Sequence, residues 1–302
     1  MRADIEFLSE GLKLRGWLYW PEPRPQRPCP VVVMAHGFSC VKEQYLDRYA
    51  EVFAAAGLAV LVYDHAHFGA SEGLPRQEVD PVRQRRGYQD AISYAQTLPG
   101  LDARRIGLWG TSYSGGHVLQ VAAHDRRVRC VVSQVPTISG YQSGLRRIRA
   151  DQLATSLARL AEDRAARFKG APPGRIPATS ADPATPCAMA GADCHAFFVA
   201  TQDFAPTWRN EVTLRSLELA RDNEPGSHVA RISPTPLLMI VAEQDVLTAT
   251  ALCLEAYQRA LPPKHLLLLP GGHFDPYVRY FARSSEAACA WFCQHLLDDY
   301  EE

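Results

Sequence analysis

Leu-Trp-Gly-Thr-Ser-Tyr-Ser-Gly-Gly, at residues 108–116, is the stretch of sequence that decides the fold of this chain. It begins inside an apolar run at 105–109 that predicts a short buried strand, and it leads into a helix-compatible segment at 117–123. A serine on a tight strand-to-helix turn projects its hydroxyl out of the sheet, and a small neighbour such as Gly110 lets the backbone make that turn. We therefore predict that Ser112 is a nucleophile and that the first amides of the helix point at the group bound to it.

Two further apolar runs end in the partners that a nucleophilic serine needs. Residues 236–242 predict a buried strand with Asp245 just beyond it, and residues 265–269 predict another that leads to a Pro-Gly-Gly-His loop ending at His273. A serine hydroxyl alone is a poor nucleophile; the histidine would take its proton, and the aspartate would orient the imidazole and stabilise the imidazolium. We predict a catalytic triad of Ser112, Asp245 and His273.

Two points about these motifs need a choice: the last position of the serine motif and the identity of the acid. The usual pattern is Gly-x-Ser-x-Gly, and here Ser114 holds the last position. Serine is small enough for us to treat this as a variant of the pattern. Asp275 lies close to His273 in sequence and is a second candidate for the acid. We favour Asp245, because ligand sites of open α/β sheets collect at the carboxyl ends of strands.

A fourth motif predicts the donors that would stabilise negative charge on a reacting carbonyl oxygen. Residues 29–35 predict a buried strand, and a His-Gly-Phe-Ser loop follows at 36–39. One backbone amide of such an oxyanion hole comes from the loop after this strand, and the other comes from the residue after the nucleophile. We therefore predict that the backbone N–H groups of Phe38 and Tyr113 form the oxyanion hole.

The order of these motifs resembles that of the α/β-hydrolase superfamily throughout the length of the chain. More closely, the chain resembles the dienelactone-hydrolase-like branch, which includes polyketide transferases and thiohydrolases of natural-product pathways. One departure is the loop at 64–71, where related chains usually read Asp-x-Arg-Gly-x-Gly-x-Ser and this chain has Ala66 and His67. The resemblance rests on residues 36–38, 110–116, 208–216, 233–236, 242–245 and 271–275.

The hydrophobic rhythm predicts alternating strands and helices around a mostly parallel sheet of about eight strands. Residues 5–11 and 12–19 predict an antiparallel pair, and residues 58–63 and 129–134 predict two more strands. With the resemblance, this pattern implies an α/β-hydrolase fold whose sheet is flanked by helices. Helices are predicted over 42–56, 82–98, 115–124, 249–260 and 281–297.

One long segment interrupts the alternation between strands six and seven. We interpret residues 141–231 as a helical cap, or lid, and predict a hydrolase core made of residues 1–140 and 232–302. The cap begins with a basic stretch at 145–149. We interpret its arginines as a solvated helix face; binding of a carboxylate or of a phosphopantetheine phosphate is the alternative.

Four side chains are candidates for contact with the substrate: His36, His67, Trp208 and Phe274. Trp208 fits the core of the cap equally well. His67 forms a pair with His65, but no carboxylate or cysteine pattern completes a metal site around them. We therefore predict neither a metal nor an organic cofactor.

Composition narrows the remaining function classes. The chain has 302 residues, of which 47% are hydrophobic and 22% charged, and a formal net charge of -1. This balance gives no electrostatic reason for binding nucleic acid or an acidic membrane. The N-terminal sequence has no apolar stretch typical of a signal peptide, and the eight scattered cysteines are typical of a reducing compartment. We expect a cytoplasmic enzyme, and a homodimer is compatible with the sequence.

The motifs together predict a serine hydrolase that cleaves a small or medium carboxylic ester or thioester through an acyl-enzyme at Ser112. The partner would be a small-molecule acyl substrate, either free or bound to a carrier as a thioester. Three alternatives stay open: an acyltransferase of a polyketide-like pathway that uses the same acyl-enzyme, a carbon-carbon bond hydrolase, and a catalytically silent binding protein.

Overall fold

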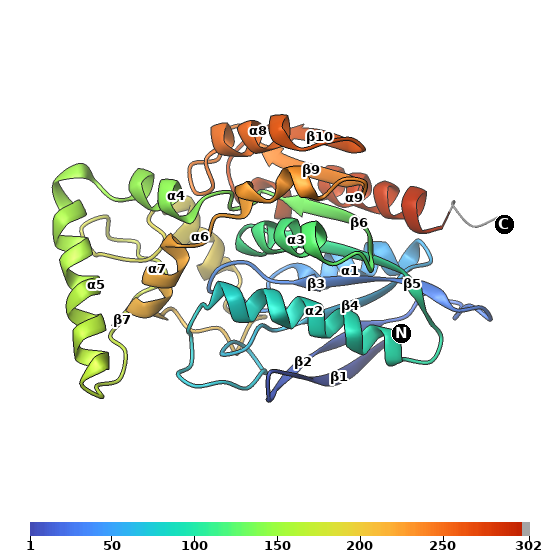
Figure 1. Cartoon of the computed structure of the whole chain (residues 1–302), viewed down its shortest axis with the longest axis horizontal. Helices are drawn as coiled ribbons and strands as arrows, with labels where there is room; N and C mark the ends of the chain where they lie inside the picture. Colours follow the sequence, from blue (N-terminus) through green and yellow to red (C-terminus); the bar gives the residue numbers. More distant parts are fainter. Residues whose placement is uncertain (298–302) are drawn as a thin grey trace.

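The central element of the fold is an eight-stranded sheet (Figure 1), in a computed structural model that describes residues 1–297. The strand order is β1-β2-β4-β3-β5-β6-β9-β10; β2 pairs antiparallel with β1 and with β4, and the other neighbours are parallel. The predicted mostly parallel sheet is therefore confirmed. Its strands are β1 (Arg2–Ser9), β2 (Leu12–Tyr19), β3 (Cys29–Ala35), β4 (Ala59–Tyr63), β5 (Leu101–Thr111), β6 (Val128–Gln134), β9 (Leu237–Ala242) and β10 (Lys264–Leu269).

Strand β3 shows why the central strands are apolar at every position. Successive side chains of a strand point to opposite faces of the sheet. Val31 and Val33 accordingly belong to one apolar cluster, and Val32 and Met34 belong to the other. Since both faces of the sheet are covered, no position of β3 is left for a polar side chain.

Helices cover both faces of the sheet. Tyr88 of α2 and Leu119 of α3 pack in the first cluster, together with residues of α8. Phe53 of α1 and Phe292 of α9 pack in the second, with ring centroids 5.3 Å apart. No helix within residues 1–297 combines the length and the hydropathy needed to cross a membrane. The bounds are α1 (Leu46–Ala55), α2 (Pro81–Thr97), α3 (Tyr113–His124), α8 (Thr250–Arg259) and α9 (Phe281–Leu296).

A mostly helical segment lies between β6 and β9, as the sequence predicts. Figure 1 shows its helices at one end of the molecule, with α5 along the outer edge, far from the sheet. The division of the chain into a core and a cap at residues 141–231 stays a prediction. The segment contains α4 (Gly140–Arg147), α5 (Leu153–Phe168), α6 (Ala192–Ala200), α7 (Leu214–Arg221) and a short antiparallel pair, β7 (Arg175–Ile176) with β8 (Val212–Thr213).

The chain enters and leaves this segment through a narrow neck formed by residues 138–140 and 223–226. Gly140 N–H donates to the Asn223 carbonyl at 2.7 Å, and Gly226 N–H donates to the Ile138 carbonyl at 2.8 Å. A Cβ on Gly140 would clash with the Ala220 carbonyl, so the two passes of the chain approach more closely than side chains allow. Both ends of the segment are thus held together beside the core.

Candidate active site

Ser112 occupies the sharp turn between β5 and α3. Its backbone has φ 55° and ψ -116°, a conformation that residues other than glycine rarely adopt. Two backbone hydrogen bonds hold it there: Ser112 N–H donates to the Gln134 carbonyl, and Thr137 N–H donates to the Ser112 carbonyl, both at 2.9 Å. A Cβ on Gly110 would clash with the Ser114 carbonyl, so glycine is required beneath the turn. The surrounding backbone therefore maintains a strained conformation at Ser112.

His273 connects Ser112 to Asp245. Its Nε2 lies 2.9 Å from Ser112 Oγ, and its Nδ1 lies 2.7 Å from Asp245 Oδ2. Asp245 also accepts hydrogen bonds from Leu247 N–H at 2.8 Å, from Thr248 N–H at 3.0 Å and from the Thr248 hydroxyl at 2.8 Å. Burial alone would raise the pKa of Asp245, but His273 and the Thr248 bonds outweigh it and lower that pKa. An ionised carboxylate can only accept, so Nδ1 donates to it and Nε2 is left to accept the Ser112 proton.

Asp275, the alternative acid, holds the loop rather than the imidazole. Its Oδ2 accepts a hydrogen bond from Gly272 N–H at 2.7 Å, and its own N–H donates to the Gly272 carbonyl at 3.2 Å. The sequence prediction missed Thr248, which binds Asp245 through both its amide and its hydroxyl. The available signal was its spacing, because an aspartate often accepts bonds from residues two or three places later.

The loop that carries Phe38 and the start of α3 at Tyr113 both lie beside Ser112 in the structure. A Cβ on Gly37 would lie 3.0 Å from Ser112 Cβ, so the loop after β3 runs directly against the nucleophile. Tyr113 is the first residue of α3, and its N–H has no acceptor within the helix. Within residues 1–297, no backbone hydrogen bond uses the N–H of Phe38. Their service as an oxyanion hole stays a prediction that this placement permits.

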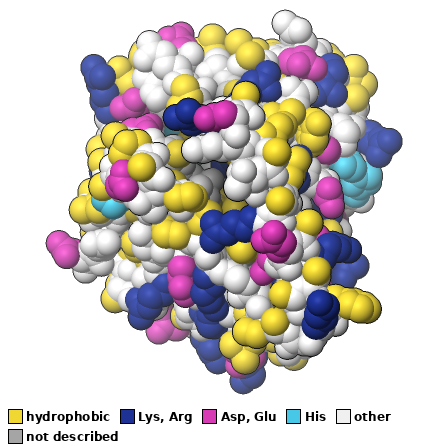
Figure 2. Space-filling view, turned by 90° about the vertical axis from the view of Figure 1, so that its left-hand side faces the viewer, with side chains coloured by type: hydrophobic (Ala, Val, Ile, Leu, Met, Phe, Trp, Pro, Cys, Tyr) yellow, Lys and Arg dark blue, Asp and Glu magenta, His cyan; other side chains and the backbone are white. Residues whose placement is uncertain are grey.

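Ser112 opens into a cavity of about 280 Å³ that Phe38 and Tyr113 also line. Most of the rest of the wall comes from helices α4, α5 and α7, from residues 148–152 and 183–190, and from Leu247 and Thr248. Figure 2 views the molecule from this end and shows a hollow near the middle of the face. The volume is close to the lower limit for pockets that hold small molecules, about 300 Å³. A small substrate therefore fits between the triad and the helical segment.

The model of the X-Pro dipeptidyl-peptidase (S15) family matches residues 10–275. The chain belongs to this family of α/β-hydrolases. The predicted membership of the α/β-hydrolase superfamily is thus confirmed, and the chain is a hydrolase enzyme.

Relatives of this S15-family hydrolase carry several names. A thiohydrolase of Eupenicillium brefeldianum is 34% identical over 91% of this chain and 88% of its own length. A quorum-quenching protein, AidA, of Acinetobacter baumannii is 33% identical over 91% of this chain and 88% of its own length. A polyketide transferase, grgF, of a Penicillium species is 31% identical over 91% of this chain and 90% of its own length. The crystal structure of the α/β-hydrolase GrgF superposes with a TM-score of 0.83 at 28% identity, covering 98% of this chain and 99% of that one.

Two of the four predicted substrate contacts are buried elsewhere in the hydrolase. The fully buried His36 ring accepts the His65 N–H at Nε2, 3.1 Å away, and its Nδ1 lies 2.9 Å from the Gly37 carbonyl. The His67 ring lies 2.9 Å from the Pro75 carbonyl. Neither ring lines the cavity. Both imidazoles instead bind backbone groups of the loops that follow β3 and β4, and the substrate contacts of His36 and His67 stay a prediction that this placement does not support.

Trp208 and Phe274 have different positions in the hydrolase. Trp208 stacks on Phe198 with ring centroids 5.0 Å apart, and its Nε1–H donates to the Ser39 carbonyl at 2.9 Å. It packs against the loop after β3 and does not line the cavity. This position agrees with the alternative prediction, in which Trp208 belongs to the apolar core. Phe274 borders a small space of about 20 Å³ beside Ser112 and His273. It is thus placed to contact a substrate, and that contact stays a prediction.

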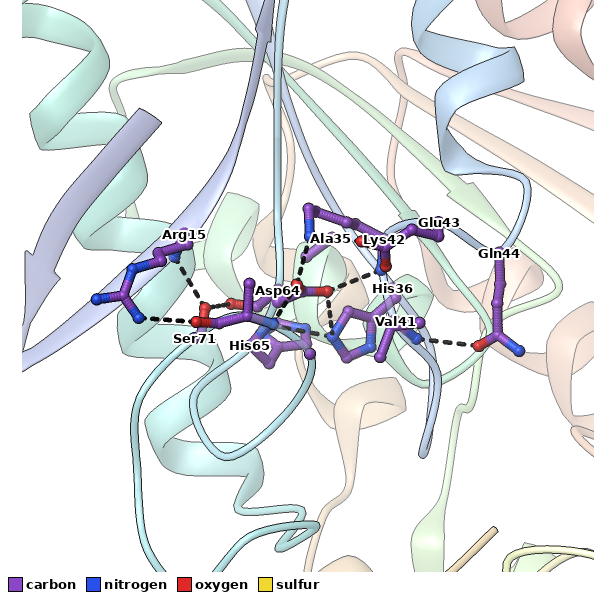
Figure 3. Close-up of polar contacts among 12 residues, drawn as sticks. Arg15, Ala35, His36, Val41, Lys42, Glu43, Gln44, Asp64, His65 and Ser71 are labelled. Carbon is purple, nitrogen blue, oxygen red and sulfur yellow. Dashed lines mark hydrogen bonds and ion pairs between the residues drawn. The ribbon is translucent and has the colours of Figure 1, made fainter. Parts of the chain in front are cut away.

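A buried ion pair, which sequence reasoning missed, anchors the loop that carries Phe38. Lys42 Nζ lies 2.7 Å from Asp64 Oδ2, and Lys42 N–H donates to Asp64 Oδ1 at 2.8 Å (Figure 3). Asp64 also accepts from Ala70 N–H at 2.9 Å, and its carbonyl accepts from the Ser71 hydroxyl at 2.6 Å. Burial alone would lower the pKa of Lys42, but Asp64 outweighs it and raises that pKa. The loops after β3 and β4 are therefore joined by paired charges.

Proposed function

We propose that this hydrolase cleaves a small or medium carboxylic ester or thioester through an acyl-enzyme at Ser112. The observation that carries the proposal is the placement of His273 Nε2, 2.9 Å from a Ser112 hydroxyl that faces the cavity. A base at hydrogen-bond distance from a serine, itself oriented by a buried carboxylate, is the arrangement that activates the hydroxyl for attack on a carbonyl.

The chemistry proceeds in two stages. As Ser112 Oγ attacks the carbonyl carbon, His273 Nε2 takes its proton, and Asp245 stabilises the imidazolium. The N–H groups of Phe38 and Tyr113 stabilise the negative oxygen of the tetrahedral intermediate. The imidazolium then protonates the leaving alcohol or thiol, which departs. Water, deprotonated by His273, attacks the acyl-enzyme and releases the acid with Ser112 restored.

Two relatives support particular choices of leaving group and of acceptor for the acyl group. The thiohydrolase at 34% identity favours a thioester, since its name states hydrolysis of a sulfur-linked substrate. The polyketide transferase at 31% identity favours a second candidate, in which an alcohol or amine attacks the same acyl-enzyme in place of water. The two reactions share every step up to the acyl-enzyme. They differ in whether the cavity admits water or an acceptor to the acyl carbon.

The helical segment and the location of the enzyme belong to the same proposal. Residues 141–231 would act as a cap that selects the acyl group, since helices α4, α5 and α7 form much of the cavity wall. We place the enzyme in the cytoplasm. None of the eight cysteines, all of which lie within residues 1–297, forms a disulfide, and reduced thiols are typical of a reducing compartment.

The test begins with a fluorophosphonate and intact-mass measurement on the wild type and on Ser112→Ala. We expect a single adduct on the wild type and none on the variant. A panel of p-nitrophenyl esters, acyl thioesters and an X-Pro p-nitroanilide then follows. Turnover in water supports the ester or thioester hydrolase, and turnover that needs an added alcohol or amine supports the transferase. Cleavage of the anilide alone, or no adduct at all, would overturn the proposal.

A further inference from the structure

The cavity in front of Ser112 carries positive charge that the proposed chemistry does not use. Its described lining residues include four arginines and no lysine, aspartate or glutamate. Figure 2 shows Lys or Arg side chains beside the hollow in this face. Acyl chains of simple esters are neutral, so they would leave these cations without a partner. The four arginines are Arg147, Arg149, Arg159 and Arg221.

The four arginines differ in exposure. Arg149 and Arg159 are exposed; Arg149 Nη2 lies 2.8 Å from Asp151 Oδ2, and Arg159 Nη2 donates to the Arg175 carbonyl at 3.5 Å. Arg147 and Arg221 are partly buried, and neither forms an ion pair with any carboxylate among residues 1–297. The partly buried charge that no carboxylate compensates therefore belongs to Arg147 and Arg221.

Arg147 is held in place while its end stays available. Its Nε–H donates to the Ser143 carbonyl one turn earlier in α4, at 3.1 Å. No hydrogen bond within residues 1–297 occupies its two terminal nitrogens. Loss of hydration lowers the pKa of Arg147, although a guanidinium remains protonated in proteins. A partly buried guanidinium whose two terminal nitrogens have no hydrogen bond among the described residues has the geometry to bind the two oxygens of a carboxylate or phosphate.

Arg221 reaches the same place from the neighbouring helix α7. Its Nη1 is buried and has no hydrogen-bond partner among the described residues. Its guanidinium lies 5.4 Å from the centroid of the Tyr141 ring. A Cβ on Gly144 would lie 3.6 Å from Arg221 Nη1, so this guanidinium sits against α4 one turn before Arg147. A buried donor without an acceptor is costly in free energy unless a ligand supplies one.

We propose that Arg147 and Arg221 form a subsite for an anionic oxygen group, a carboxylate or a phosphate, on the substrate that Ser112 attacks. This inference rests on the proposed function, because Ser112 and both arginines line one cavity. The anion could belong to the acyl chain as a second carboxylate, or to the leaving group as the phosphate of a thiol carrier. The favoured substrates are thus charged at one end and carry the reacting carbonyl at the other.

The first experiment compares two p-nitrophenyl esters of equal chain length, the neutral hexanoate and the monoester of adipic acid. We expect Arg147→Met and Arg221→Met to lower the ratio of kcat/KM for the charged ester to that for the neutral one by about tenfold or more. The matched control is Arg146→Met. Arg146 lies on the same helix, binds Gln142 at 2.8 Å and does not line the cavity. Its ratio should equal that of the wild type.

A second comparison tests the other source of the anion. Hexanoyl-coenzyme A carries phosphates in its leaving group, and the hexanoyl thioester of N-acetylcysteamine does not. If Arg147→Met lowers kcat/KM for hexanoyl-coenzyme A but not for the adipate ester, the subsite binds the leaving group. A drop for the adipate ester alone assigns it to the acyl chain. Two ratios of kcat/KM are therefore compared: the adipate ester to the hexanoate ester, and the coenzyme A thioester to the N-acetylcysteamine thioester. If both ratios stay within twofold of the wild type in Arg147→Met and Arg221→Met, the subsite is overturned.

Binding to Ser112→Ala separates this proposal from the proposed function. Calorimetry with monomethyl adipate and with methyl hexanoate should show tighter binding of the charged ester, and Arg147→Met in the same background should remove the difference. If the wild type turns over no ester but this difference is found, the anionic subsite stands and the hydrolase mechanism fails. Equal binding of the two esters excludes an anion on the acyl chain, and together with an unchanged kcat/KM for hexanoyl-coenzyme A in Arg147→Met it overturns the subsite.

Discussion

Asp245 Oδ2 and His273 Nδ1 lie 2.7 Å apart, although the two residues are 28 positions apart in the chain, with helix α8 between them. The contact follows from the sheet, because β9 and β10 are adjacent parallel strands whose carboxyl ends meet at one edge. Asp275 is nearer in sequence and binds Gly272 N–H instead. Neighbouring strands, rather than neighbouring residues, thus bring the acid to the base.

This relationship predicts unequal effects for two conservative substitutions. Asp245→Asn should lower kcat by about 10⁴-fold, because an amide no longer selects the productive tautomer or stabilises the imidazolium. Asp275→Asn loosens the loop before the histidine, and we expect a loss below about tenfold. Steady-state kinetics on the best ester of the panel would measure both. The opposite ranking would remove Asp245 from the triad.

Gly37 offers a test of the oxyanion loop that leaves the triad in place. In Gly37→Ala, the new Cβ would meet Ser112 Cβ at 3.0 Å and displace the loop that carries Phe38 N–H. Loss of one oxyanion donor typically lowers kcat by about 10²-fold to 10³-fold, with a smaller change in KM. The matched control is Gly87→Ala in α2, where the Cβ finds ordinary contacts at 3.4 Å. Unchanged kcat in Gly37→Ala would contradict the predicted role of Phe38.

The pair formed by Lys42 and Asp64 should stabilise the fold as well as the site. Asp64→Asn leaves a buried ammonium without its main partner, and we expect the free energy of unfolding to fall by about 3 kcal/mol. Urea denaturation measures this change. Glu72→Gln provides the comparison: Glu72 pairs with Arg15 at the surface, where an ion pair contributes about 1 kcal/mol or less. Similar losses in the two variants would show that burial adds nothing to the inner pair.

The buried histidines predict loss of stability in mild acid. Burial lowers the pKa of His36, His65 and His117 in the folded chain, while unfolded histidine titrates near pH 6.5. The unfolded state therefore binds more protons below that pH, so stability is complete above it and falls below it. Between about pH 7.5 and about pH 5.5, His65 and His117, whose pKa values lie well below the ordinary one, should each cost about 1.4 kcal/mol.

A variant isolates this effect from that of buried carboxylates such as Glu43, whose pKa burial raises. His117→Gln should lose less stability than the wild type over the same pH interval, by about 1.4 kcal/mol. His124→Gln, at an exposed position, is the control and should follow the wild type. Urea denaturation at the two pH values measures both. Parallel losses in all three proteins would mean that His117 is charged when folded.

The fold could be predicted largely from sequence because its buried strands differ sharply in composition from their surroundings. The predicted strand at 29–35 coincides with β3, and the predicted helix at 82–98 is displaced by one residue from α2, which begins at Pro81. Strand β5 is longer than predicted, since its first residues, with Asp102 and Arg104, lie partly at the surface and carry no apolar run. Helix α6 was not predicted.

The site was harder to predict from the sequence where its function depends on contacts between residues far apart in the chain. Ser112, Asp245 and His273 each follow a recognisable strand, so their meeting could be expected. The basic stretch at 145–149 was interpreted as a solvated face, and the structure turns Arg147 into the cavity while Arg146 faces outward. Helix position alone does not distinguish them, because the orientation of α4 is decided by packing against α7.

The neck at residues 138–140 and 223–226 makes the helical segment exchangeable. Since both passes of the chain are joined there by hydrogen bonds at 2.7 and 2.8 Å, a segment of different length or sequence can begin and end at the same two points without moving the sheet. If this segment selects the acyl group, as proposed, we expect natural variation or redesign within it to change what is cleaved while the sheet and the triad stay the same.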